Sequence, residues 1–180
     1  MHCWKSFNGN KKNLFYRNFA ISIFVSFFVF IAIFVPTQAM GYGHLKDNNF
    51  LIFLCAFILL YPVHKLFHIL PILSHRKEMK IDFEYYFLAL PVINITINKP
   101  IQIRQFLIAL LFPCVIINLL LIAAIFLFPH YVHYSSILIA IHFGLCTVDF
   151  MYAKNLITSP SGALVEENEN GYEILIKDNQ

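Results

Sequence analysis

Residues 50–70 read FLIFLCAFILLYPVHKLFHIL, an apolar stretch with its only charged or imidazole groups near the end. A helix needs about 20 mostly apolar residues to cross the hydrocarbon core of a bilayer. Three further apolar stretches of this kind lie at residues 19–35, 106–128 and 131–152. The sequence therefore predicts an α-helical integral membrane protein with about four transmembrane helices.

The composition supports this fold class. Hydrophobic residues make up 59% of the chain and charged residues 13%, and the mean hydropathy is +0.67. A soluble domain carries roughly 25% charged residues, so this chain has too little polar surface to be a soluble globule. The net charge of +3 comes with basic residues that lie beside the apolar stretches. We therefore expect a lipid bilayer as the surroundings and no nucleic-acid partner.

The basic residues also predict an orientation. Lys and Arg are common in residues 1–18 and 75–105, whereas residues 37–49 hold only Lys46 and residues 129–135 hold neither type. Because cytoplasmic loops carry the excess of Lys and Arg, both termini and the long internal connection are expected in the cytoplasm. The predicted location is the cell membrane, with multiple passes.

The chain divides into a basic N-terminal segment (residues 1–18), a membrane domain (19–152) and an acidic tail (153–180). A cleaved signal peptide is the alternative for the first span, since Thr37-Gln38-Ala39 is a tolerable cleavage site. The apolar run is longer than the usual ~7–15 residues of a signal peptide. This length favours a retained first helix.

Two parts of the chain favour strands. Residues 83–97 are rich in β-branched and aromatic residues, which predicts one or two strands between the second and third spans. In the tail, residues 163–166 and 172–176 are apolar runs that flank Asn170-Gly171. An Asn-Gly pair between such runs predicts a C-terminal cytoplasmic hairpin.

Polar groups inside spans are costly, at about 2.5–3.5 kcal/mol for Lys or Asp at the centre of a helix. His64 and His68 are four residues apart, so they lie on one helix face and are spaced to share a metal ion. His142, Cys146 and Asp149 lie on one face of the fourth span, from which a third ligand would come. The alternatives are an interfacial histidine pair and an aspartate solvated at its helix end.

His64-Lys65-Leu66-Phe67-His68 is similar to the zincin motif His-Glu-x-x-His, with Lys in place of Glu. With Asp149 on a later span, it resembles a bacterial family of small multipass membrane proteins described as zincin peptidases. These are similar in layout to site-two intramembrane metalloproteases. Lys99-Pro100 and Leu110-Leu111-Phe112-Pro113 also match this resemblance, which covers roughly residues 50–176.

The resemblance implies that His64, His68 and Asp149 are zinc ligands, with water at the fourth position. From their place on the same helix face as Asp149, His142 and Cys146 are expected to lie around the ligands. In zincins the Glu of the motif takes the proton of the zinc-bound water. Lys65 replaces that Glu, and His142 stands where a small amide is expected. Both departures from the family pattern fall on the site itself.

Lys65 is the departure with the larger consequence. An ammonium ~5 Å from a divalent ion feels roughly 6–7 kcal/mol of repulsion at an effective dielectric of about 20. Either Lys65 is neutral beside zinc, or the metal is absent and Lys65 pairs with Asp149. The second solution satisfies two costly charges at once.

The expected function is therefore a non-catalytic pseudoenzyme that binds or regulates another membrane protein or a peptide client. An active intramembrane zinc metallopeptidase is the alternative. A weaker alternative is a small transporter or proton relay that uses His64, His68, His142 and Asp149.

Overall fold

The computed structural model describes residues 1–8, 11–41, 44–86, 90–97, 99–160, 162–168 and 171–176. Four of its helices are long and apolar enough to cross a membrane, which agrees with the four predicted spans. They are α1 (Lys11–Ala39), α2 (Phe50–Ile69), α3 (Ile103–Leu127) and α4 (Val132–Ile157). Two short 3-10 helices, η1 (Leu70–His75) and η2 (Pro129–Tyr131), extend α2 and precede α4.

The first helix is longer than predicted at both ends, since it begins at Lys11 and continues through Pro36 to Ala39. A proline inside a helix removes one backbone donor but keeps its carbonyl. The carbonyl of Pro36 accepts a hydrogen bond from the N–H of Met40 at 3.0 Å. The last turn of α1 is therefore still closed beyond the proline.

The predicted strand region between the second and third spans is a hairpin of two strands. They are β2 (Met79–Tyr86) and β3 (Leu90–Ile97), paired antiparallel from Met79 opposite Ile97 to Tyr86 opposite Leu90. The first strand begins four residues before the predicted region. The β-branched and aromatic content therefore predicted the strands correctly, but not the residue at which the first strand begins.

The predicted tail hairpin is also present, as β5 (Leu164–Asn168) and β6 (Gly171–Ile176). It belongs to a four-stranded sheet of order β1-β6-β5-β4, in which β4 is Ile101–Gln102 and β1 is His2–Asn8. Strand β1 is not predicted from the sequence, since its partner β6 lies at the other end of the chain. Asn170 lies outside the described residues.

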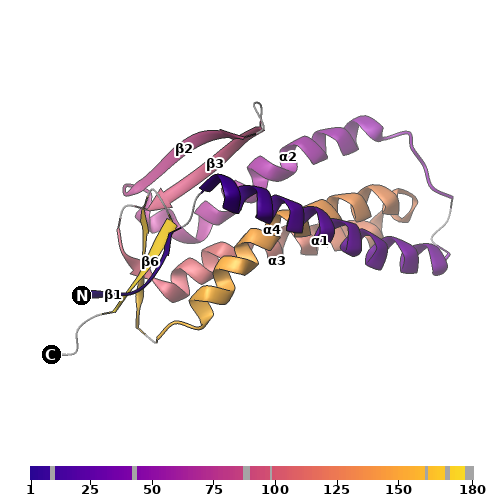
Figure 1. Ribbon diagram of the computed structural model, residues 1–180. Coiled ribbons are helices and arrows are strands. Elements are labelled where there is room, and N and C mark those ends of the chain that lie inside the picture. Colours follow the sequence, from indigo (N-terminus) through magenta and orange to yellow (C-terminus); the bar gives the residue numbers. More distant parts are fainter. Residues whose placement is uncertain are drawn as a thin grey trace.

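The strands gather at one end of the helices, together with both termini (Figure 1). At the opposite end, the connection between α1 and α2 meets η2: the hydroxyl of Tyr131 donates to Asn48 Oδ1 at 2.9 Å, and the N–H of Lys46 donates to the His130 carbonyl. Because β1 and β6 share a sheet, the chain passes along the bundle an even number of times. This arrangement is compatible with the four-span prediction.

Helix α4 is the most enclosed of the four and packs against α1 and α3. Gly144 allows the close approach of α1: a Cβ at this position would meet Ser26 Oγ and would lie 3.0 Å from the Ser22 carbonyl oxygen. Large apolar side chains such as Phe28, Leu51 and Leu119 are exposed on the other helices. An apolar outer surface of this kind is what a lipid-facing bundle requires.

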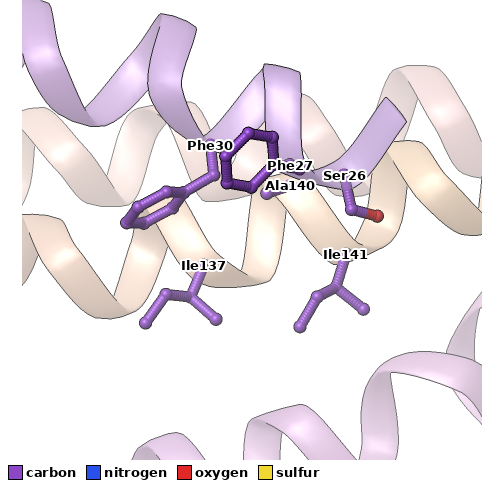
Figure 2. Close-up of a pocket in the computed structure, with 6 residues that line it drawn as sticks. All are labelled: Ser26, Phe27, Phe30, Ile137, Ala140 and Ile141. Carbon is purple, nitrogen blue, oxygen red and sulfur yellow. The ribbon is translucent and has the colours of Figure 1, made fainter. Parts of the chain in front are cut away.

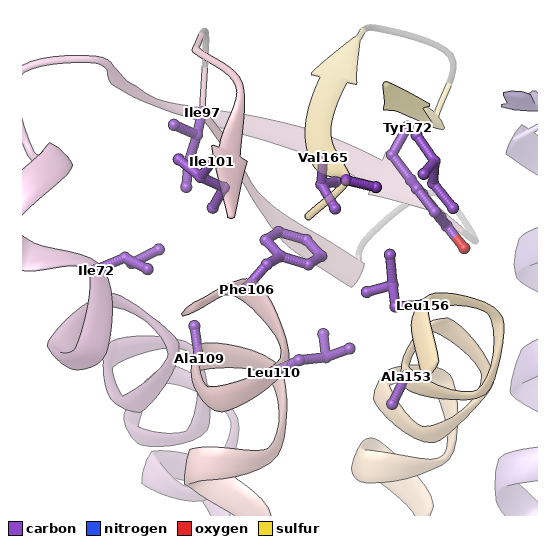
Figure 3. Packing of buried hydrophobic residues seen from close by; sticks show 12 residues of the cluster. Ile72, Ile97, Ile101, Phe106, Ala109, Leu110, Ala153, Leu156, Val165 and Tyr172 are labelled. Atoms are coloured by element: carbon purple, nitrogen blue, oxygen red, sulfur yellow. The ribbon is translucent and has the colours of Figure 1, made fainter. Parts of the chain in front are cut away.

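A hydrophobic core joins the sheet to the ends of α3 and α4 (Figure 3). Phe106 and Leu110 of α3 and Leu156 of α4 point toward Val165 and Tyr172 of the sheet. Burial of apolar side chains contributes about 1.5–3 kcal/mol each. The sheet is therefore held against the ends of α3 and α4 by apolar contacts.

Candidate metal centre

The two histidines of the His-Lys-x-x-His segment face each other across one turn of α2. His64 Nε2 and His68 Nε2 are 3.1 Å apart, and the two rings are nearly perpendicular. His64 is buried and His68 is partly buried. The helix continues through Pro62, so the four-residue spacing places both rings on one face as predicted.

Asp149 of α4 completes the group. Its Oδ2 lies 3.3 Å from His64 Nε2, and its Oδ1 lies 3.5 Å from His68 Nε2. The structure therefore brings together all three residues that the sequence singled out as ligands, from two helices that are far apart in the chain. One ligand atom from each lies within 4.8 Å of the others, which is close enough to hold one metal ion.

The separations fit a tetrahedral zinc site. Zinc binds histidine nitrogen at about 2.0–2.1 Å and carboxylate oxygen at about 2.0–2.2 Å, so two ligand atoms of a tetrahedron lie about 3.3–3.4 Å apart. The His64 Nε2–His68 Nε2 separation of 3.1 Å and the His64 Nε2–Asp149 Oδ2 separation of 3.3 Å are near this value. The other carboxylate oxygen, Asp149 Oδ1, lies 3.5 Å from His68 Nε2. With three protein ligands, the fourth tetrahedral position is left to water or substrate, as in catalytic zinc sites.

The donor chemistry also fits a cation. His68 Nδ1 lies 2.9 Å from the carbonyl oxygen of Ala109. A carbonyl only accepts, so Nδ1 carries the proton and Nε2 turns its lone pair toward Asp149. Asp149 Oδ2 is buried and has no hydrogen-bond partner. Such an electron-rich group in a low-dielectric interior is costly unless a cation is present, so the residues fit zinc.

His142 and Cys146 of α4 lie behind this centre. His142 Nε2 is 3.1 Å from His64 Nδ1, and Cys146 Sγ is 3.8 Å from His142 Nδ1. Both side chains are fully buried. A histidine ligand is commonly oriented by a hydrogen bond at its second ring nitrogen, and His142 occupies that place for His64.

Lys65 does not form the expected pair with Asp149. Within 4.0 Å, the ion pairs of Asp149 in the described part of the chain are with His64 and His68. Neighbouring residues of a helix project about 100° apart, so Lys65 leaves the face that carries the two histidines. The charges of both Asp149 and Glu167 nevertheless act on Lys65.

Glu167 is the polar residue that the sequence did not single out, because it is one of several acids in the tail. It lies on β5, and its Oε2 accepts a hydrogen bond from the N–H of Ile97 at 2.8 Å. Burial raises the pKa of this carboxyl to about 7, although the Ile97 N–H and the charge of Lys65 act in the opposite direction. Its position depends on the sheet, so no local pattern would have identified it.

A groove between α1 and α4 is a separate feature (Figure 2). It is lined by Ser26, Phe27, Phe30, Ile137, Ala140 and Ile141. Its one polar side chain, Ser26, donates its hydroxyl proton to the Ser22 carbonyl at 2.9 Å. The lining therefore supplies no acid, base or metal ligand.

The comparisons with known proteins bear on this centre directly. Residues 57–164 match the sequence profile of a family described as "Putative zincin peptidase". The match covers more than half of the chain and includes His64, His68 and Asp149. No curated protein and no solved structure matches the chain. The chain belongs to the family described as putative zincin peptidases.

Proposed function

We propose that this protein holds zinc in a membrane-embedded, peptidase-like core but does not hydrolyse peptide bonds, and that it binds another membrane protein or a peptide client. The observation that carries this proposal is Lys65. It lies between two well-placed ligands, His64 and His68, at the position where zincins have Glu. The core is thus built for the metal and lacks the usual proton acceptor.

Zinc bound at such a site lowers the pKa of its water to about 7, and a carboxylate then takes the proton. As an ammonium, Lys65 has three donors and no acceptor. As a neutral amine it would accept one proton, but the ammonium so formed would be repelled by the nearby zinc ion. Lys65 therefore supports binding without turnover.

An active zinc metallopeptidase is the second candidate, and Glu167 is the observation that favours it. Its carboxyl is largely buried, has a pKa of about 7 and interacts electrostatically with Lys65. A general base works best when its pKa is near the working pH. In this candidate, Glu167 of β5 takes over the role that the motif gives to Glu.

For the orientation, we propose that the sheet and both termini face the cytoplasm of a bacterial cell. The support is the excess of Lys and Arg in residues 1–18 and 75–105, which lie at the sheet end of the helices. Positive charge favours the cytoplasmic side. The location proposed is the cell membrane.

The test compares zinc content and proteolysis of the detergent-purified protein, with labelled casein as the substrate. We expect about one zinc per chain in the wild type and no cleavage. K65E restores the His-Glu-x-x-His motif and should produce cleavage, whereas the neutral control K65Q should not.

Two results would overturn the proposal. Cleavage by the wild type that is lost in E167Q would establish the second candidate. A folded wild type that contains no zinc would support the alternative in which no metal is bound and Lys65 is a charge partner of Asp149.

A further inference from the structure

A second group of metal-binding side chains lies directly beside the first. His142 Nε2 and His64 Nδ1 are 3.1 Å apart, and Cys146 Sγ is 3.9 Å from His142 Nε2. One ligand atom each from His64, His142 and Cys146 lies within 4.8 Å of the other two. All three residues are buried, so a cation there would be enclosed by α2 and α4.

Among the described residues, this group has three members and does not include Cys114 of α3. The Asn118 amide donates to Cys114 Sγ at 3.5 Å. Two imidazoles and one thiol therefore meet where α2 and α4 face one another.

The chemistry of this set differs from that of the first. A thiolate is a softer ligand than a carboxylate, so this set suits soft ions such as Cu⁺ and Cd²⁺ better than the first set does. A thiol loses its proton when it binds a metal. One thiolate would neutralise a monovalent ion such as Cu⁺, which matters in a membrane interior where a net charge is costly.

We infer that His64, His142 and Cys146 form a second metal site, better suited to soft ions than the first, that shares His64 with the site of His68 and Asp149. The two sites use opposite nitrogens of the same ring. A neutral imidazole has one lone pair, so His64 serves one ion at a time.

Whichever ring nitrogen of His64 binds an ion, the other nitrogen carries the proton and has a polar neighbour. When Nε2 binds zinc, the Nδ1–H donates to His142 at 3.1 Å. When Nδ1 binds a soft ion, Nε2 carries the proton and lies 3.3 Å from Asp149 Oδ2. The His64 tautomer thus selects between the two positions.

The test uses the full chain, purified in detergent, stripped of metal by a chelator and titrated with Cd²⁺. Thiolate coordination produces a near-ultraviolet charge-transfer band. We expect this band in the wild type, where Cys146 supplies the thiolate, and none in C146S. Cadmium affinity should fall roughly tenfold or more in C146S.

C55S is the matched control, since Cys55 is an exposed cysteine of α2, and its band should equal that of the wild type. D149N removes the first site and should keep the band, so failure of the proposed zinc site leaves this result unchanged. Absence of the band in cadmium-saturated wild type, or a band of full size in C146S, would overturn the inference. Residual cadmium bound by C146S through His68 and Asp149 would show that this variant is folded.

Discussion

The imidazole of His68 donates its Nδ1–H to the carbonyl oxygen of Ala109 at 2.9 Å. Ala109 belongs to α3, a helix that provides no ligand to the zinc site proposed here. This one bond determines which ring nitrogen of His68 faces Asp149. Helix α3 therefore positions the site, although the His-Lys-x-x-His segment contains none of its residues.

The role of α3 can be tested at Ala109, which is buried. A109L would push α3 away from α2 and weaken the hydrogen bond that orients His68. Loss of such a supporting bond typically lowers metal affinity about 10–100-fold. Zinc affinity, measured by competition with a chromophoric chelator, should fall by this amount in A109L. The control is A123L, at an exposed position of the same helix, and an equal loss in both variants would contradict this role.

The contact between α1 and α4 makes a prediction about stability. G144A places a Cβ against Ser26 Oγ and 3.0 Å from the Ser22 carbonyl oxygen. Overpacking of this kind typically costs about 1–3 kcal/mol, so the melting temperature in detergent should fall. The double variant G144A/S26A should recover only part of the loss, because the backbone oxygen stays in place. Full stability of G144A would show that the two helices are not held this closely.

The pairing of the two chain ends can be tested in β1. Ser6 lies opposite Glu173 in the β1–β6 ladder. S6P removes a backbone donor and disfavours a paired strand, whereas S6T keeps the donor and has high strand propensity. Amide hydrogen exchange of residues 171–176 should become faster in S6P and stay unchanged in S6T. Unchanged exchange in S6P would mean that β1 does not protect β6.

Glu167 should make stability depend on pH. The pKa of this carboxyl is raised from 4.5 to about 7 in the folded protein, chiefly by burial. A carboxyl with a raised pKa favours the folded state while it is protonated, so stability should decrease as the pH rises from about 4.5 through 7. E167Q should be more stable than the wild type at pH 8 and similar to it at pH 5. Thermal unfolding at both pH values checks this, with E166Q as the control on the same strand.

The parts of the site that the sequence predicted correctly are those that depend on one helix at a time. His64 and His68 share a face because they are four residues apart, and this relation holds in any helix. Asp149 was singled out because a carboxylate inside a span is costly. That these three residues meet depends on how α2 and α4 are packed, for which the family resemblance served as the guide.

The missed parts all depend on contacts between distant segments. Lys65 was expected to pair with Asp149, but within 4.0 Å the ion pairs of that carboxylate in the described residues are with His64 and His68. Glu167 reaches the neighbourhood of Lys65 only because β5 lies in the sheet above the helices. Strand β1 pairs with the edge of β6, which lies at the other end of the chain. A local sequence pattern does not identify so distant a pairing partner.

The proposed ligand set can be tested by the zinc K-edge X-ray absorption spectrum of the wild-type protein, purified in detergent without chelator. If His64, His68 and Asp149 hold the ion, zinc should have a shell of nitrogen and oxygen at about 2.0–2.2 Å, with the scattering pattern of two imidazoles and no sulfur. Zinc with a sulfur neighbour at about 2.3 Å, or a folded protein without zinc, would contradict the claim that His64, His68 and Asp149 hold the ion.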